Sequence, residues 1–155
     1  MCAKNIDWSE LGFGYIKTDW RYVANYKDGK WDEGTLTADH TVTLNECACV
    51  FQYAQTCFEG MKAYRNPEGG VQLFRPMDNI RRLNDSCDRL CIPRIPEEDF
   101  VQAVKAVVNV DKDWIPSEPG TSLYVRPFVI ATDEFLGVAP SKNYLFIIIL
   151  SPSGA

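Results

Sequence analysis

The chain has 155 residues, of which 46% are hydrophobic and 24% charged, and its formal net charge is −5. This composition is typical of a soluble globular domain and excludes a disordered chain. The negative charge argues against a nucleic-acid surface, because such surfaces cluster cations.

Neither a secretory signal nor a membrane span is expected. The N-terminal residues lack an apolar stretch, and the most apolar run, residues 144–150, is too short to cross a bilayer as a helix. We therefore expect a cytoplasmic protein that binds no membrane and no nucleic acid. In a reducing compartment its six cysteines should be free thiols. Cys47 and Cys49 lack a second ligand pair, so no metal site is predicted.

The first half of the chain predicts two hairpins, a strand and a short helix. The hairpins follow from β-prone runs joined by residues with turn chemistry. The helix is expected to stop at a glycine. In chain order, the elements are a hairpin that turns at Asp28-Gly29, a strand over residues 41–44, a helix over residues 48–57 that stops at Gly60, and a hairpin of residues 61–65 and 71–75.

Two amphipathic helices are predicted next. The first has Asp78 as its N-cap and runs to about Leu90. The second has Pro96 in its first turn and acidic residues 97–99 at its positive N-terminal end. The residues expected to face the core are Ile80, Leu83, Cys87, Leu90 and Cys91 in the first helix, and Phe100, Val104, Val107 and Val108 in the second.

Two strands are predicted last, over residues 122–130 and 144–150. The second is apolar at nearly every position, as in a strand covered on both faces. Pro127 places the first at a sheet edge or at a bulge, because proline cannot donate to a ladder. The order of hairpins, helices and strands predicts an α+β fold, a mostly antiparallel sheet with helices packed on one side.

No P-loop, Rossmann glycine pattern, zinc-protease motif or nucleophile elbow occurs in the sequence. A series of other strings stands in a fixed order instead. They are Gly12-Phe13-Gly14, Thr18-Asp19, the run from Tyr53 to Arg65, Leu73-Phe74-Arg75-Pro76, Asn79-Ile80-Arg81-Arg82-Leu83, Leu123-Tyr124-Val125-Arg126-Pro127, Leu136-Gly137-Val138 and Ser151-Pro152-Ser153-Gly154. Together they resemble the branched-chain amino acid aminotransferases, which are class IV pyridoxal-phosphate-dependent enzymes. The run from Tyr53 matches their pattern Y-A-x-x-x-F-E-G-x-K-A-Y-R.

The resemblance implies that residues 1–155 form the small N-terminal domain of a two-domain enzyme. Such enzymes are homodimers that hold pyridoxal 5'-phosphate between their domains and move the amino group of leucine, isoleucine or valine to 2-oxoglutarate. Their partners are therefore small amino acids and 2-oxo acids. The Schiff-base lysine is expected beyond Ala155, since Lys62 matches a noncatalytic lysine. This chain alone then contains no catalytic residue and is expected to be inactive.

The resemblance also implies a set of binding residues. Arg82 matches an arginine that contacts the cofactor phosphate, although pattern alone places it opposite the apolar stripe, as a solvated arginine would lie. Arg126 matches an arginine that accepts the second carboxylate of glutamate, and the strand period puts it on the same face as Tyr124. Three further matches lie in the substrate pocket: Tyr53, Phe58 and Tyr124. Leu136 and Val138 match a loop that reaches the partner subunit's site. Tyr53 is also similar to a residue contributed across the dimer.

Two positions qualify the resemblance. Lys17 stands where many members of the family carry a pocket-closing phenylalanine, and Tyr15 is expected to serve instead. Glu59 is interpreted as structural, holding backbone amides or an arginine. Two other functions remain open: a different class IV enzyme, such as a D-amino acid aminotransferase or aminodeoxychorismate lyase, and a noncatalytic module that dimerises or binds metabolites.

Overall fold

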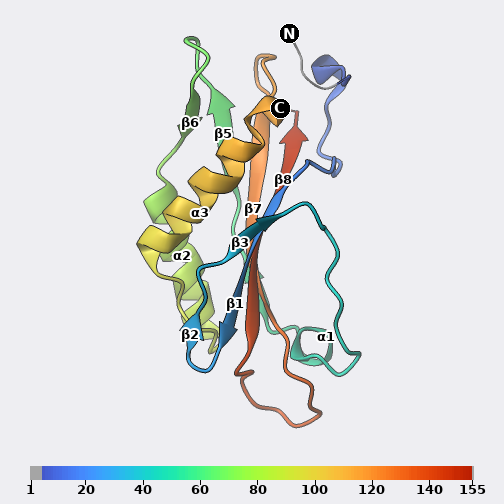
Figure 1. Cartoon of the computed structure of the whole chain (residues 1–155), viewed down its shortest axis with the longest axis vertical. Coiled ribbons are helices and arrows are strands. Elements are labelled where there is room, and N and C mark those ends of the chain that lie inside the picture. The colour runs from blue at the N-terminus through green and yellow to red at the C-terminus, as the bar shows by residue number, and fades with distance from the viewer. Residues whose placement is uncertain (1–4, 155) are drawn as a thin grey trace.

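One eight-stranded antiparallel sheet dominates the computed structural model, which describes residues 5–154 (Figure 1). Its strands are β1 (Arg21–Lys27), β2 (Lys30–Trp31), β3 (Thr35–Thr37), β4 (Thr56–Phe58), β5 (Met61–Arg65), β6 (Val71–Leu73), β7 (Ser122–Ala131) and β8 (Tyr144–Ser153). The helices are α1 (Cys49–Tyr53), α2 (Pro76–Arg89) and α3 (Glu97–Val110), with 3-10 turns at Trp8–Glu10 and Lys112–Trp114. The predicted α+β fold is confirmed. None of these helices is long and apolar enough to cross a bilayer within the described part of the chain.

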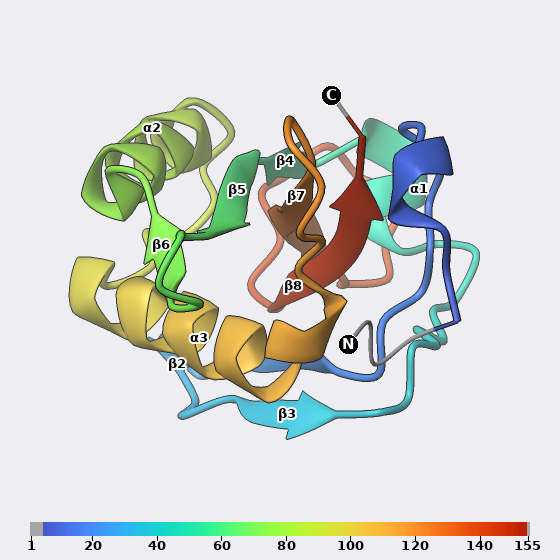
Figure 2. The same cartoon turned by 90° about the horizontal axis from the view of Figure 1, so that it is seen from above.

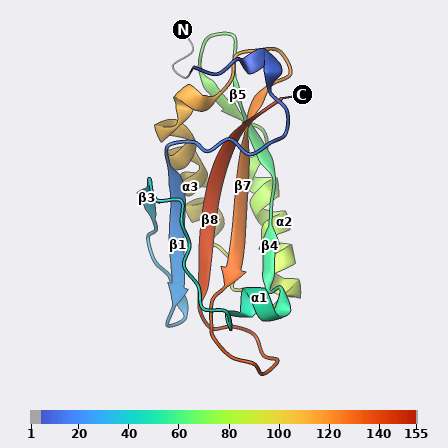
Figure 3. The ribbon, with the colours of Figure 1, turned by 90° about the vertical axis from the view of Figure 1, so that its right-hand side faces the viewer.

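The order of the main strands is β2-β1-β8-β7-β5-β6, with β3 beside β1 and β4 beside β7. Helices α2 and α3 lie on one side of this sheet (Figure 2). On the other side, the N-terminal segment crosses over β7 and β8 (Figure 3). Adjacent residues Ile147 and Ile148 of β8 point to opposite faces and are both fully buried. The prediction of a strand covered on both faces is therefore confirmed.

The predicted hairpins and both long helices are also present. Asp28 and Gly29 have φ values of 53° and 81°, as a tight hairpin turn of matching twist requires. In α3, every predicted core residue is buried, and Phe100 stacks on Phe146 of β8 with ring centroids 6.0 Å apart. In α2 the outcome is mixed: Ile80, Leu83 and Cys87 are buried, but Leu90 and Cys91 lie beyond the last turn and are exposed.

Three element boundaries differ from the predictions. Residues 41–44 form no strand, and the Thr41 carbonyl accepts a hydrogen bond from the Arg21 guanidinium at 2.7 Å. The predicted helix over residues 48–57 ends at Tyr53, where Ala54 adopts left-handed backbone angles, and the chain then enters β4. Helix α2 begins at Pro76 instead of after Asp78, since Arg75 is its N-cap and Pro76 occupies the first helical position.

The expectation for Pro127 is wrong, because it lies inside an interior strand. Phe58 of β4 faces Phe128 and Met61 of β5 faces Val125, so the register is continuous and contains no bulge. The carbonyl of Pro127 accepts a hydrogen bond from the Glu59 amide, 2.9 Å away. Because proline has no amide hydrogen, Pro127 cannot donate a hydrogen bond to the Glu59 carbonyl. The ladder along β7 is therefore interrupted between β4 and β5. Pro127 thus costs the sheet one hydrogen bond without ending it.

Candidate ligand-binding site

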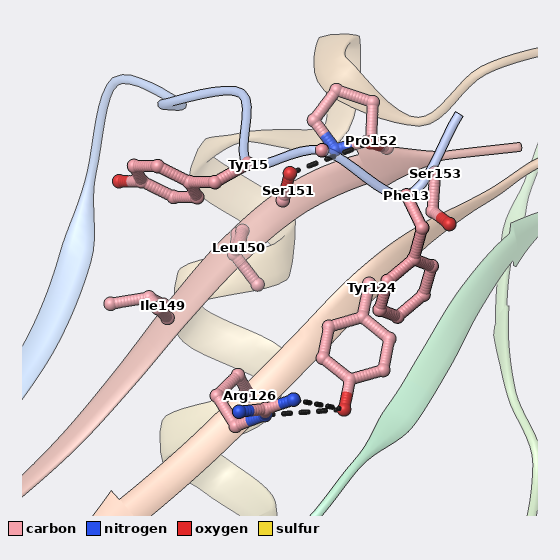
Figure 4. A pocket seen from close by; sticks show the side chains of 10 residues that line it. Phe13, Tyr15, Tyr124, Arg126, Ile149, Leu150, Ser151, Pro152 and Ser153 are labelled. Atoms are coloured by element: carbon pink, nitrogen blue, oxygen red, sulfur yellow. Dashed lines mark hydrogen bonds between the residues drawn. The ribbon is translucent and has the colours of Figure 1, made fainter. Parts of the chain in front are cut away.

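A cavity of about 260 Å³ opens on the sheet face that α2 and α3 do not cover (Figure 4). Tyr124 and Arg126 of β7 point into it, beside Ile149 and Ser151, their partners on β8. The prediction that both side chains share one face is confirmed. The lining residues are Phe13, Gly14, Tyr15, Tyr124, Arg126, Ile149, Leu150, Ser151, Pro152 and Ser153. Apolar walls with a few polar groups are what a small amphiphilic ligand needs.

The guanidinium of Arg126 is held by two aromatic side chains. Its Nε and Nη2 donate to the Tyr124 hydroxyl at 3.1 and 3.0 Å. Its Cζ lies 4.2 Å from the centroid of the Phe58 ring, which is a favourable cation–π geometry. Nη1 makes no hydrogen bond to any described residue, so it remains available to an acidic group of a ligand.

Phe13 lines the cavity, although no role for it was predicted from the sequence. Its ring meets the Tyr124 ring edge-on, with centroids 5.4 Å apart. The segment that carries it is tied to β8, because the Ile16 amide donates to Ser151 Oγ and the Gly154 amide donates to the Gly12 carbonyl, both at 2.9 Å. The only signal in the sequence was the string around Gly12, which gave Phe13 no role.

Tyr15 also lines the cavity, as expected from the departure at Lys17. Lys17 is exposed and is not among the lining residues. The hydroxyl-bearing ring of Tyr15 therefore forms this part of the wall, beside Ser151 and Leu150 (Figure 4).

Glu59 and Arg82 form a second polar group, on β4–β5 and α2. Nε and Nη2 of Arg82 lie 2.7–3.1 Å from both carboxylate oxygens of Glu59. Asn79 Nδ2 donates to Glu59 Oε2 at 2.9 Å. These hydrogen bonds raise the pKa of the Arg82 guanidinium above its usual value, because Glu59 stabilises the charged form. The interpretation of Glu59 as a residue that holds an arginine is confirmed.

Gly60 connects the two polar groups. A Cβ at this position would lie 2.4 Å from the Tyr124 hydroxyl oxygen, so Tyr124 can approach only because residue 60 is glycine. The Gly60 carbonyl accepts a hydrogen bond from Asn79 Nδ2 at 3.2 Å. Hence Phe58, Glu59 and Gly60, three successive residues, contact Arg126, Arg82 and Tyr124 respectively.

The other predicted residues lie elsewhere. The Tyr53 hydroxyl donates to the Leu136 carbonyl, which joins α1 to the loop of residues 132–143. This loop and α1 lie at the opposite end of the sheet from the C-terminal end of β8 (Figure 1), and that end of β8 contributes Ser151, Pro152 and Ser153 to the cavity. Leu136 and Val138 are 72% and 89% exposed, and neither lines the cavity; nor does Tyr53. Their role across a dimer remains a prediction.

Arg82 retains the geometry that a phosphate group needs. A guanidinium offers two edges for paired hydrogen bonds, and Glu59 occupies only the Nε–Nη2 edge. Nη1 has no partner among residues 5–154, and the side chain is 69% exposed. The Nη1–Nη2 edge can therefore bind an anion while Glu59 holds the other edge. The residues present fit a phosphate at this point.

No family model matches the chain. It is 47% identical to a branched-chain-amino-acid aminotransferase of Helicobacter pylori over 153 residues, which are 98% of this chain and 45% of the relative. The corresponding protein of Haemophilus influenzae is 48% identical with the same coverage. A branched-chain-amino-acid transaminase of Bacillus subtilis is 48% identical over 96% of this chain and 42% of its own length. The chain thus spans less than half the length of these relatives.

Solved structures show the same fold. The branched-chain amino acid aminotransferase of Escherichia coli matches with a TM-score of 0.68 at 22% identity, over 90% of this chain and 41% of that one. The T.th. enzyme with pyridoxamine 5'-phosphate matches with a TM-score of 0.70, at the same identity and coverage. The matched region is the N-terminal part of these proteins. The structures support the fold, and the sequence identities show that the chain is similar, over nearly its whole length, to part of the branched-chain-amino-acid aminotransferases.

Proposed function

We propose that residues 1–155 are the small domain of a pyridoxal-phosphate-dependent branched-chain amino acid aminotransferase and form one wall of its active site. The observation that carries this proposal is the contact of Phe58, Glu59 and Gly60 with Arg126, Arg82 and Tyr124. One short segment thereby contacts both the arginine proposed to bind phosphate and two residues of an amphiphilic cavity. The whole protein would transfer the amino group of leucine, isoleucine or valine to 2-oxoglutarate.

In this proposal Arg82 would hold the cofactor phosphate with the guanidinium edge that Glu59 does not occupy, and Glu59 keeps the side chain in position. When bound, the cofactor supplies the electron sink for amino-group transfer. The lysine that carries it belongs to the part of the protein that follows this domain. The task of residues 1–155 is therefore to bind and orient, and the chain alone is expected to be inactive.

The cavity can accept two different side chains. Phe13, Tyr124 and Ile149 provide apolar surface for a branched aliphatic group. Arg126 provides a hydrogen-bonding cation for the second carboxylate of a glutamate-like substrate. Structures of the T.th. enzyme contain N-(5'-phosphopyridoxyl)-L-glutamate, which has a carboxylate side chain, and 4-methylvaleric acid, which has a branched aliphatic chain. That pair of ligands supports the same dual recognition here.

The proposal includes a homodimer in which Leu136 and Val138 reach the partner subunit's site, with Tyr53 beside them. Its support is the exposure of both loop side chains and the hydrogen bond that fixes Tyr53 to this loop. Two exposed apolar side chains on one loop are ordinary by themselves, so the family resemblance carries this part of the proposal. We also place the enzyme in the cytoplasm, which accords with the free thiols of the described cysteines.

The test is an activity measurement on the whole protein with pyridoxal phosphate. We expect it to convert leucine and 2-oxoglutarate to a branched 2-oxo acid and glutamate. Preferential turnover of D-alanine or of aminodeoxychorismate would assign a different class IV activity. A protein that turns over none of these substrates and yet binds branched amino acids would be a noncatalytic module, and the proposal would fail.

A further inference from the structure

Two cysteines from different elements meet close to the Glu59–Arg82 ion pair. Cys57 lies in the middle of β4, and Cys87 lies near the end of α2. Their Sγ atoms are 3.6 Å apart. We propose that Cys57 and Cys87 form an oxidisable dithiol, a modification site that closes to an intramolecular disulfide. The inference does not depend on the proposed catalytic function.

The geometry brings the thiols near bonding distance. Helix α2 packs on β4, and the two sulfur atoms already face each other within hydrogen-bond range. A disulfide requires the separation to shorten from 3.6 Å to about 2.05 Å. Closure would therefore require rotation of the two side chains and a movement of α2 toward β4. The contact joins residues 30 positions apart in the sequence.

The two thiols differ in exposure and in pKa, and both differences favour Cys57 as the residue that reacts first. Cys87 is fully buried, whereas Cys57 is partly exposed and can meet a small oxidant. The hydrogen bond between the two thiols, in which either sulfur can be the donor, lowers the pKa of Cys57 and raises the pKa of Cys87. Asp88 also raises the pKa of Cys87, and Arg94 opposes this more weakly. Cys57 is therefore the nucleophile and Cys87 the resolving thiol.

The oxidant we assign is a hydroperoxide, with hydrogen peroxide as the simplest case. The Cys57 thiolate attacks one peroxide oxygen, the O–O bond breaks, and Cys57 becomes a sulfenic acid as hydroxide leaves. The Cys87 sulfur then attacks the Cys57 sulfur, displaces the hydroxyl group as water and forms the S–S bond. In total, two thiols and one peroxide give one disulfide and two waters. A dithiol reductant reverses the modification.

The remaining described cysteines lack this arrangement. Cys49 is fully buried, and burial is the first cause that raises the pKa of its thiol. Cys47 is partly exposed and Cys91 exposed, and within residues 5–154 neither has a thiol contact like that of Cys57. These two residues therefore serve as matched controls. Because Cys57 precedes Glu59 by two positions and Cys87 follows Arg82 by five, the disulfide would covalently join the two elements that carry this ion pair.

The experiment treats the whole protein with hydrogen peroxide, blocks remaining thiols with N-ethylmaleimide, and maps the peptides by mass spectrometry without reduction. We expect a linked Cys57–Cys87 peptide, the loss of two blockable thiols and a mass lower by about 2 Da, as formation of one S–S bond requires. Dithiothreitol should restore both thiols. Cys47→Ser and Cys91→Ser should form the same link.

Cys57→Ser should abolish the link, and Cys87→Ala should leave Cys57 as a sulfenic acid that dimedone captures. Cys57 is the safer substitution site because it is only partly buried, so it keeps the test valid if the Cys87 variant fails to fold. The proposal is overturned if the native protein gives only sulfinic acid, only links to other cysteines or only intermolecular disulfides. Equal peroxide sensitivity of Cys47 or Cys91 in the folded protein would overturn it as well.

Discussion

Glu59 and Arg82 form a bidentate ion pair in which the carboxylate side chain is 7% exposed and the arginine side chain 69% exposed. The buried partner therefore positions the exposed one. A second donor, Asn79, completes the coordination of the carboxylate. This arrangement leaves one edge of the guanidinium directed to solvent, where an anion can bind.

Replacing Glu59 by glutamine should lower the free energy of unfolding by about 1 kcal/mol, because the charge-assisted hydrogen bonds weaken and solvent screens part of the effect. Urea denaturation at neutral pH measures this change. Glu68→Gln, in the exposed turn between β5 and β6, is the matched control and should leave stability unaltered. An equal loss in both variants would mean that the ion pair contributes nothing to stability.

Arg126→Lys should raise the KM for 2-oxoglutarate about tenfold or more and change the KM for leucine much less. Lysine keeps the charge but cannot form the paired contacts to the Tyr124 hydroxyl or stack in the same way on Phe58. Under the proposed function, steady-state kinetics of the whole protein with leucine and 2-oxoglutarate provide the comparison. Arg89→Lys, on the exposed end of α2, is the control. A parallel rise for leucine and 2-oxoglutarate would contradict the role assigned to Arg126.

Gly60→Ala should displace Tyr124, since the added Cβ would lie 2.4 Å from its hydroxyl oxygen. Contacts with Phe13 and Arg126 resist the movement, and we expect a loss of about 1–3 kcal/mol in the free energy of unfolding. Gly137→Ala should have little effect, because an added Cβ there meets nothing within 4 Å.

The double variant Gly60→Ala/Tyr124→Phe removes the oxygen that clashes and should recover part of the lost stability. Denaturation of the single and double variants forms a thermodynamic cycle. Strictly additive losses would show that the two side chains do not compete for the same space.

The raised pKa of Tyr144 should make the free energy of unfolding decrease as the pH rises above 10. Burial raises the pKa of its hydroxyl from 10.0 to about 12 in the folded state. The folded protein thus favours the neutral phenol, and this contribution is complete below pH 10 and is lost as the pH rises toward 12. Tyr144→Phe should flatten that part of the stability profile, measured by urea denaturation between pH 8 and pH 12. An unchanged profile would rule out Tyr144 as its source.

At neutral pH the same variant should lose about 1–2 kcal/mol, because the Ser141 carbonyl and the Gln55 amide lose a hydrogen-bond partner in the interior. Tyr15→Phe, an exposed tyrosine on the cavity wall, is the control and should retain full stability.

Local patterns predicted most of the fold. The hairpin at Asp28-Gly29 and helix α3 depend on turn chemistry and helical spacing within short windows, which the sequence displays directly. Residues 41–44 have an alternating pattern too, but a strand also needs a neighbouring strand to pair with, and these residues pair with none in the described structure. Strand pairing depends on contacts between residues that are distant in the sequence, so a short stretch of sequence does not show whether a partner strand is present.

The site was predictable to the extent that it lies on regular elements. The strand period placed Tyr124 and Arg126 together, and the family resemblance singled out Arg82. Phe13 was not assigned because its place depends on a long-range contact: Ile16 and Ser151, which dock its segment on β8, are 135 residues apart. The sequence also did not determine that Glu59 binds Arg82, because a buried glutamate can bind backbone amides or an arginine equally well.

Pro127 has a consequence for how this sequence can change over time. Any other residue there would supply an amide directed at Glu59, and β4 and β5 could then join as one uninterrupted strand. Such a substitution would stiffen the segment that touches Arg82, Tyr124 and Arg126 without altering a single ligand-facing side chain. Mutation of residue 127 during evolution can therefore change the mobility of the cavity wall while its lining side chains stay the same.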